Sequence, residues 1–135
     1  MSNLEEELLL GIEAQMNQQL ETAHDHYTTV LEAEPSHPDA NHAFGLLLVE
    51  KRQWRAAVPY LHSALEGRPQ AQHLWFDCLD AMIGAELWSE ANDLIAKARR
   101  FGLSSEELDI RELLALTGRT HQNLQGYDEA FTLVT

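Results

Sequence analysis

The amino-acid sequence predicts an all-α protein, an α-solenoid of antiparallel helix hairpins with three repeats and a partial, shifted fourth. The main observation is a fixed spacing of 34 residues. It relates small residues, prolines and tryptophans: Gly11 and Gly45, Ala23, Ala57 and Ala91, Pro35 and Pro69, and Trp54 and Trp88. A period of this length, with small residues where helices cross, is typical of stacked helical hairpins. The repeats are expected at about 4–37, 38–71, 72–103 and 105–135.

The first repeat is predicted from apolar residues at helical spacing, followed by a proline. The first helix, about 4–18, carries them at Leu4, Leu8, Leu9, Ile12 and Met16. A turn at 17–20 leads to a second helix from about Glu21 to Ala33, which Pro35 ends.

The next two repeats follow the same order. Pro38 suits a helix start, and the expected helices cover about 38–50 and 54–66, then 71–84 and 88–100. Gly102 is expected to cap the last of these helices.

After Leu103 the period slips. Gly118, Tyr127 and Ala130 match Gly45, Trp54 and Ala57 at a distance of 73 residues, which is two periods plus five. We therefore expect a lengthened seventh helix and an eighth that begins near Asp128. The apolar end, with Phe131, Leu133 and Val134, suggests the N-terminal part of a longer protein, or a last hairpin completed by a second chain.

The charge limits the partners. Acidic residues outnumber basic ones and give a formal net charge of −13, which disfavours nucleic acid and anionic membranes. No apolar stretch approaches the roughly 18 residues of a membrane span, and no signal peptide is evident. The expected location is cytoplasmic, which the single cysteine, Cys78, also fits.

The repeated residues resemble the tetratricopeptide repeat family. The family pattern of small, large apolar and proline positions is matched over nearly the whole chain: Leu10-Gly11, Ala14, Ala23, Tyr27, Val30 and Pro35; Phe44-Gly45, Leu48, Ala57, Leu61, Ala64 and Pro69; Trp75, Cys78-Leu79, Met82, Ala91, Ile95 and Ala98. The third repeat has Leu103 in place of the proline. The resemblance implies a right-handed superhelix whose concave groove is lined by the first helix of each repeat.

The resemblance also implies which residues line that groove: Glu5, Leu8, Ile12, Gln15 and Met16; Asp39, His42, Leu46, Val49 and Glu50; His73, Phe76, Asp80 and Ile83; and, in the shifted repeat, Glu112, Ala115, Arg119 and Gln122. The candidate partner-binding residues among them are Leu8, Ile12, Met16, His42, Leu46, Val49, His73, Phe76, Asp80 and Ile83. Chaperone-binding members of the family hold a peptide carboxylate with Lys, Arg and Asn. This chain has Leu8, Ile12, His42, Leu46, Phe76 and Asp80 at the matching positions, so that clamp is absent.

An apolar strip bordered by acids remains, formed by Leu8, Ile12, Met16, Leu46, Phe76 and Ile83. It is either partly core, narrowed by the curvature of the superhelix, or the seat of an amphipathic helix from a partner, a second copy or the rest of the chain. In the second interpretation, Phe76→Asp abolishes partner capture without unfolding the protein.

No catalytic or metal-binding pattern is evident. The seven histidines lack zinc-ligand spacing, Cys78 reads as a packed thiol, and phosphate loops, nucleophile elbows and dinucleotide fingerprints are missing. We expect no enzyme and no cofactor.

The favoured function is a protein–protein interaction module or scaffold that holds a helix or peptide, with acids selecting basic flanks. The alternative is an N-terminal accessory domain, for substrate docking or dimerisation, of a larger bacterial transferase. A third is homodimerisation as the main role.

Overall fold

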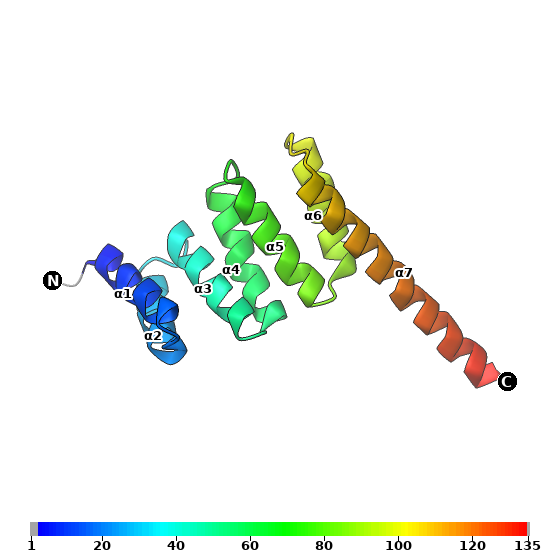
Figure 1. Ribbon diagram of the computed structural model, residues 1–135, viewed down its shortest axis with the longest axis horizontal. Helices are drawn as coiled ribbons and strands as arrows, with labels where there is room; N and C mark the ends of the chain where they lie inside the picture. Colours follow the sequence, from blue (N-terminus) through cyan, green and yellow to red (C-terminus); the bar gives the residue numbers. More distant parts are fainter. Residues whose placement is uncertain (1–2, 135) are drawn as a thin grey trace. The chain divides into compact units, whose positions relative to one another are not determined.

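The structure is a computed structural model that describes residues 3–134, with side chains as far as Thr120. Seven helices follow one another along the chain (Figure 1): α1 (Leu4–Met16), α2 (Leu20–Ala33), α3 (Pro38–Glu50), α4 (Trp54–Gly67), α5 (Gln72–Gly84), α6 (Trp88–Arg100) and α7 (Glu106–Val134). Helices α1 and α2, α3 and α4, and α6 and α7 pack against each other as hairpins. The predicted all-α fold of sequential hairpins is confirmed, and most predicted helix ends agree within two residues.

The chain divides into two compact units, one ending at Ala81 and the other beginning at Met82. The first unit contains α1 to α4 and most of α5. The second contains the last residues of α5, then α6 and α7.

Two glycines set the spacing of the hairpins in the first unit. A Cβ atom on Gly11 would lie 2.5 Å from Cε1 of Tyr27, and one on Gly45 would lie 2.6 Å from Cδ2 of Leu61. Real Cβ atoms do not approach other atoms so closely, so any larger residue at either position would force the facing side chain to move. The predicted role of these glycines in bringing paired helices together is confirmed.

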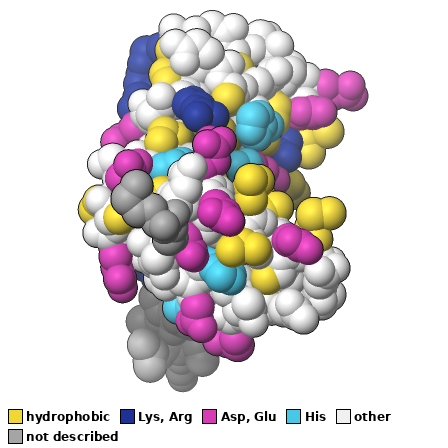
Figure 2. All heavy atoms as spheres, turned by 90° about the vertical axis from the view of Figure 1, so that its left-hand side faces the viewer, with side chains coloured by type: hydrophobic (Ala, Val, Ile, Leu, Met, Phe, Trp, Pro, Cys, Tyr) yellow, Lys and Arg dark blue, Asp and Glu magenta, His cyan; other side chains and the backbone are white. Residues whose placement is uncertain are grey.

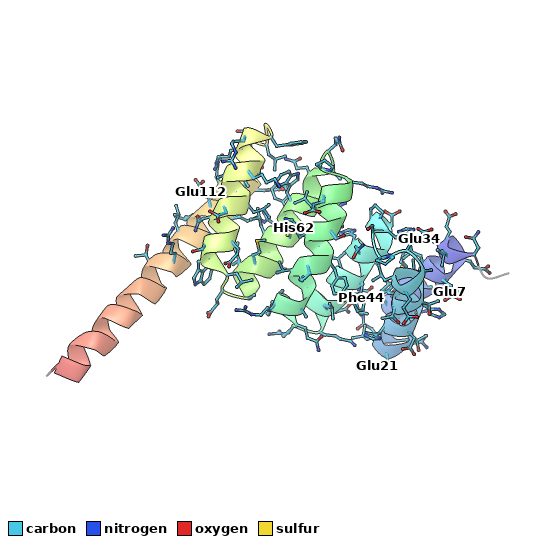
Figure 3. The ribbon with its side chains drawn as sticks, turned by 180° about the vertical axis from the view of Figure 1, so that it is seen from behind. Glu7, Glu21, Glu34, Phe44, His62 and Glu112 are labelled. Carbon is cyan, nitrogen blue, oxygen red and sulfur yellow. The ribbon has the colours of Figure 1, made fainter. Side chains whose placement is uncertain are left out.

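An aromatic cluster fills the space between the hairpins of the first unit. Phe44, labelled in Figure 3, is buried and meets Tyr60 edge-to-face, with ring centroids 4.7 Å apart. Its ring also meets those of Tyr27 and His24. Such edge-to-face contacts stabilise a core beyond the apolar area that they bury.

The hairpin turns repeat one backbone conformation that the sequence alone did not reveal. Gln18, Arg52 and Glu86 all have φ near +60°, and they lie 34 residues apart. In each turn the next N–H donates to the carbonyl five residues earlier, as from Gln19 to Ala14 at 2.8 Å. This is the Schellman motif, which usually has glycine at the left-handed position. Gly102 takes that position after α6, as predicted.

The loops before α3 and α5 repeat one hydrogen bond with different residue types. The side chain of Asn41 donates to the carbonyl of Pro35 at 2.9 Å. One period later, the indole N–H of Trp75 donates to the carbonyl of Pro69, also at 2.9 Å. Both side chains are buried and tie the start of a helix to the loop that precedes it.

In the second unit, α6 and α7 are joined by close packing and ion pairs. A Cβ atom on Gly118 would lie 2.6 Å from the ring of Trp88, and the Arg99 guanidinium pairs with Asp109 at 2.9 Å and with Glu112 at 3.3 Å. Hydrogen bonds to both carboxylates raise the pKa of Arg99.

The predicted eighth helix is wrong, because α7 continues without interruption from Glu106 to Val134. The segment contains no proline, and a glycine inside a helix costs only about 1 kcal/mol. Gly126 therefore does not end the helix, although the match of Tyr127 to Trp54, the first residue of α4, predicts a turn at this point. The side chains of Gln122, Phe131, Leu133 and Val134 lie outside the described part of the chain.

None of the described helices combines the length and apolar character that crossing a membrane requires.

Candidate functional site

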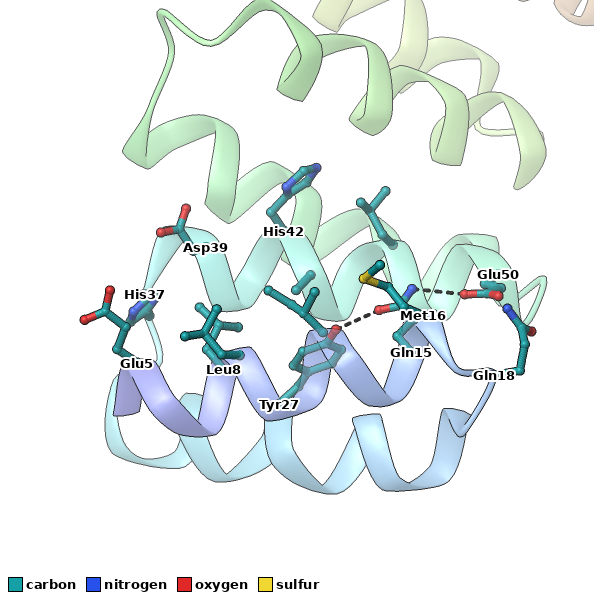
Figure 4. Close-up of a pocket in the computed structure, with 14 residues that line it drawn as sticks. Glu5, Leu8, Gln15, Met16, Gln18, Tyr27, His37, Asp39, His42 and Glu50 are labelled. Carbon is teal, nitrogen blue, oxygen red and sulfur yellow. Dashed lines mark hydrogen bonds between the residues drawn. The ribbon is translucent and has the colours of Figure 1, made fainter. Parts of the chain in front are cut away.

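The candidate site is a groove of about 750 Å³ in the first unit, between α1 and α3 (Figure 4). We call it the α1–α3 groove. Fourteen residues line it: Glu5, Leu8, Leu9, Ile12, Gln15, Met16, Gln18, Tyr27, His37, Asp39, His42, Ala43, Leu46 and Glu50. Its residues come mainly from the faces of α1 and α3 that look toward each other across the opening.

Large apolar side chains of α1 are exposed in the groove. Met16 is 77% exposed, Leu9 61% and Ile12 37%, whereas Leu8 is buried at its base. Their spacing of three and four residues places them on one side of the helix. In the space-filling view onto the α1 end, apolar side chains lie among acids and histidines (Figure 2).

Acids stand at both ends of the groove, and among its described lining residues there is no lysine or arginine. Figure 4 shows Glu5 and Asp39 at one end and Glu50 at the other. Asp39 is neutralised by Arg68, with 2.7 Å between Oδ1 and Nη1. The groove therefore presents an apolar strip with negative charge at its ends.

A chain of hydrogen bonds crosses the groove at its Glu50 end. The hydroxyl of Tyr27 donates to Oε1 of Gln15 at 2.7 Å, and Nε2 of Gln15 donates to Oε2 of Glu50 at 3.0 Å. It links α2, α1 and α3. Burial, and then the charge of Glu50, raise the pKa of Tyr27 to about 12, so the hydroxyl keeps its proton at neutral pH.

The two histidines of the groove have structural partners. His37 accepts the N–H of Ala40 at 3.1 Å and so caps α3. Nε2 of His42 lies 2.7 Å from Oδ2 of Asp77 on α5, and its ring stacks at a tilt near His73.

The structure brings together five of the ten predicted partner-binding residues, namely Leu8, Ile12, Met16, His42 and Leu46. The other five do not line this groove. Val49 is half-buried, while His73 and Asp80 are exposed elsewhere on the first unit. Ile83 belongs to the second unit.

The expectation that Phe76 is an open anchor is wrong, because its side chain is only 7% exposed and belongs to the core. A charge introduced there would be buried, so Phe76→Asp should unfold the protein rather than spare it. Ala115, also expected in a groove, is fully buried in the second unit. Glu112 pairs with Arg99, and Arg119 is exposed.

Five lining residues were not expected in the groove: Leu9, Gln18, Tyr27, His37 and Ala43. Tyr27 was expected only as a packing residue, since it shares its repeat position with Leu61 and Ile95. The one available signal was its hydroxyl, which a buried position must satisfy.

Cys78 is fully buried, and burial together with the charge of Asp77 raises its pKa to about 12. The thiol therefore stays protonated, which confirms the prediction of a packed, unreactive cysteine. Among the described side chains, no group of three His, Cys, Asp or Glu residues is arranged to hold a metal ion.

The sequential hairpins and the close glycine contacts are those of a tetratricopeptide-like fold, and solved structures agree. The chain is similar to MamA AMB-1 (TM-score 0.76, 20% identity, covering 97% of this chain and 73% of that one). It is also similar to a point mutant of MamA (TM-score 0.74, 19% identity, covering 98% and 78%).

A third similar structure is the TPR2B domain of yeast Sti1, in a complex with pHsp70 (TM-score 0.69, 20% identity, covering 84% of this chain and 96% of that one). The chain thus has the tetratricopeptide repeat fold. No protein-family model matches the sequence, and no curated protein matches it.

Proposed function

We propose that the chain is a protein–protein interaction module that binds an amphipathic helix in the α1–α3 groove. The observation that carries this proposal is the exposure of Leu9, Ile12 and Met16 together in one groove. Apolar side chains that are exposed together in one patch usually mark a binding interface, whereas single exposed apolar residues are common on any protein surface. An amphipathic helix matches them through its own apolar residues at three- and four-residue spacing.

These side chains would supply part of the binding energy. Complete burial of one large apolar side chain contributes roughly 1.5–3 kcal/mol. Three such side chains would offset the ordering of the side chains around them, at about 0.5–1.5 kcal/mol each, and the other contacts of the ligand must offset the loss of free motion on association.

The Sti1 domain supports the proposal as an example of this fold in a complex with a protein-derived ligand. The chemistry differs here, because acids and apolar side chains line the groove and no lysine or arginine is among its described lining residues. A ligand with an apolar stripe suits this lining better than one that presents a carboxylate.

The test is to sort a display library of helical 15-residue peptides, with randomised apolar and flanking positions, on the purified chain. We expect enriched peptides to lose binding to the Met16→Glu variant by at least tenfold. Leu10→Glu is the matched control, since Leu10 is a partly exposed leucine of α1 outside the groove. Failure to enrich any peptide, or equal loss in both variants, would refute the proposal.

Self-association is a second candidate, favoured by α7. Ile110, Leu113 and Leu114 are each at least half exposed and share one side of this helix. Light scattering over a concentration series would show a dimer that Leu113→Glu dissociates. A monomer at all concentrations would exclude this role.

A further inference from the structure

We infer that Glu50 anchors a cation, the Lys or Arg side chain of the bound helix, and that Tyr27 and Gln15 position its carboxylate. The inference rests on the proposed function, because it concerns the same groove. It assigns one end of the groove to the basic flank of the ligand.

The direction of the hydrogen-bond chain follows from the chemistry of Glu50. An ionised carboxylate only accepts hydrogen bonds, so Gln15 must turn its amide nitrogen toward Glu50 and its oxygen toward Tyr27. The Tyr27 hydroxyl then has to donate. The buried tyrosine thus fixes which way the Gln15 amide points, and that amide holds one carboxylate oxygen, Oε2.

The other oxygen of Glu50 remains for a ligand. Oε1 accepts no hydrogen bond within the described part of the chain, and Glu50 is exposed. The neighbouring cation, Lys51, pairs with Glu21 instead, at 2.9 Å. Glu50 therefore faces the groove without a basic partner from its own surroundings.

The helix ends add to the negative potential. Glu50 is the last residue of α3, and Gln15 and Met16 end α1 beside it. Neither helix has a basic residue in its last turn. The carbonyl ends of both helices carry partial negative charge, which favours a cation at this end.

The opposite end is less suited to a cation. Asp39 is already paired with Arg68, and Glu5 lies in the first turn of α1, where the helix dipole is positive. The two ends of the groove thus differ, and the Glu50 end is the stronger site.

The fold itself does not need this hydrogen-bond chain. One and two periods after Gln15 stand Val49 and Ile83, and after Tyr27 stand Leu61 and Ile95. All four are apolar, and their repeats form the same helices. The polar pair in the first repeat is therefore an addition to the structural pattern, located where the groove opens.

The test uses the peptides enriched by the library sort. On the wild-type chain we expect Lys or Arg at one end of the apolar stripe. A synthetic copy with citrulline, the neutral isostere, in place of that Arg should bind about tenfold more weakly, as expected for one charge-assisted hydrogen bond. On Glu50→Gln the Arg and citrulline peptides should bind equally.

Tyr27→Phe separates positioning from packing, because it keeps the ring against Gly11 and removes only the hydroxyl. We expect the preference for Arg over citrulline to fall to about threefold, while Leu10→Glu keeps the full tenfold. Gln15→Met also breaks the hydrogen bonds from Tyr27 to Glu50, and it replaces Tyr27→Phe in this test if that variant folds poorly.

The outcomes distinguish the two proposals. Failure to enrich any peptide refutes the proposed function and this inference together. Enriched peptides without a basic flank, or equal wild-type affinity for Arg and citrulline, overturn the role of Glu50 and leave the proposed function standing. An unchanged tenfold preference in both Tyr27→Phe and Gln15→Met overturns the positioning role alone.

Discussion

The first two hairpins have the same architecture and different chemistry. Tyr27 in the first and Leu61 in the second occupy the same repeat position, are at most 1% exposed, and press against Gly11 and Gly45 at nearly equal distances. Only Tyr27 carries a polar atom, which reaches Gln15, whose counterpart in the second hairpin is Val49. The comparison shows that these two hairpins each pack a large side chain against a glycine, and that this side chain can be polar or apolar without a change of architecture.

The glycines give the largest expected effect and test whether the two hairpins share one structural requirement. Gly11→Ala and Gly45→Ala should each lower the free energy of unfolding by about 1–3 kcal/mol, because the new methyl group overlaps the facing side chain. Urea unfolding monitored by circular dichroism measures the loss. Glu13→Ala, at an exposed position of α1, is the control and should change little. A neutral result at either glycine would show that the hairpins relax differently.

Alkaline pH should weaken the first hairpin through Tyr27. Its pKa is raised from 10.0 to about 12 in the folded protein, so ionisation is easier in the unfolded chain. The stability that this group contributes is present below pH 10 and is lost as the pH rises toward 12. Unfolding measured between pH 9 and 12 should show this fall, and Tyr27→Phe should reduce it. The part due to Cys78 should persist in the variant.

At neutral pH the hydroxyl of Tyr27 should contribute less to the free energy of unfolding than the packing of its ring does. Tyr27→Phe removes one hydrogen bond and is expected to cost about 0.5–1.5 kcal/mol, measured by thermal unfolding. A loss above about 3 kcal/mol would mean that the first hairpin needs these hydrogen bonds to fold. That result would contradict the comparison, because the second hairpin has the same architecture without them.

The smallest effect is expected at the turns, where the two hairpins are alike. Arg52 has φ of 60°, a conformation that costs other residues about 1–2 kcal/mol and glycine very little. Replacement by glycine would remove this cost, but glycine also has more freedom in the unfolded chain, which offsets part of the gain. Arg52→Gly should therefore raise the free energy of unfolding by about 0.5 kcal/mol. The same change at Gln18 should give the same gain, and a difference between them would reveal an unequal turn.

The helices and their packing could be predicted because they depend on residue types that recur with the period. Pro35 and Pro69 lie just after the ends of α2 and α4, and Gly11 and Gly45 mark close contacts. The length of α7 could not be predicted in this way, because Tyr127 matches Trp54, which begins a helix, and so predicts a turn that the structure does not have.

The groove could be predicted only in part. Leu8, Ile12, Met16, His42 and Leu46 were located by the family pattern, which indicates the side of the helix. Phe76 was misplaced, because that pattern does not say how deeply each position is covered. The link from Tyr27 to Glu50 joins three helices and has no counterpart in the second and third repeats, so the 34-residue period could not reveal it.

The turns at Gln18, Arg52 and Glu86 share one backbone conformation and divide the chain into segments with matching ends. Because the segments 19–52 and 53–86 each begin just after a left-handed residue and end at one, we expect that either segment can be duplicated without a new linker. Insertion of a second copy of residues 19–52 after Arg52 would lengthen the array by one hairpin and would add a second surface like that of α3. We therefore expect that the array can be extended by copying such a segment, because backbone hydrogen bonds close these turns with three different residue types at the left-handed position.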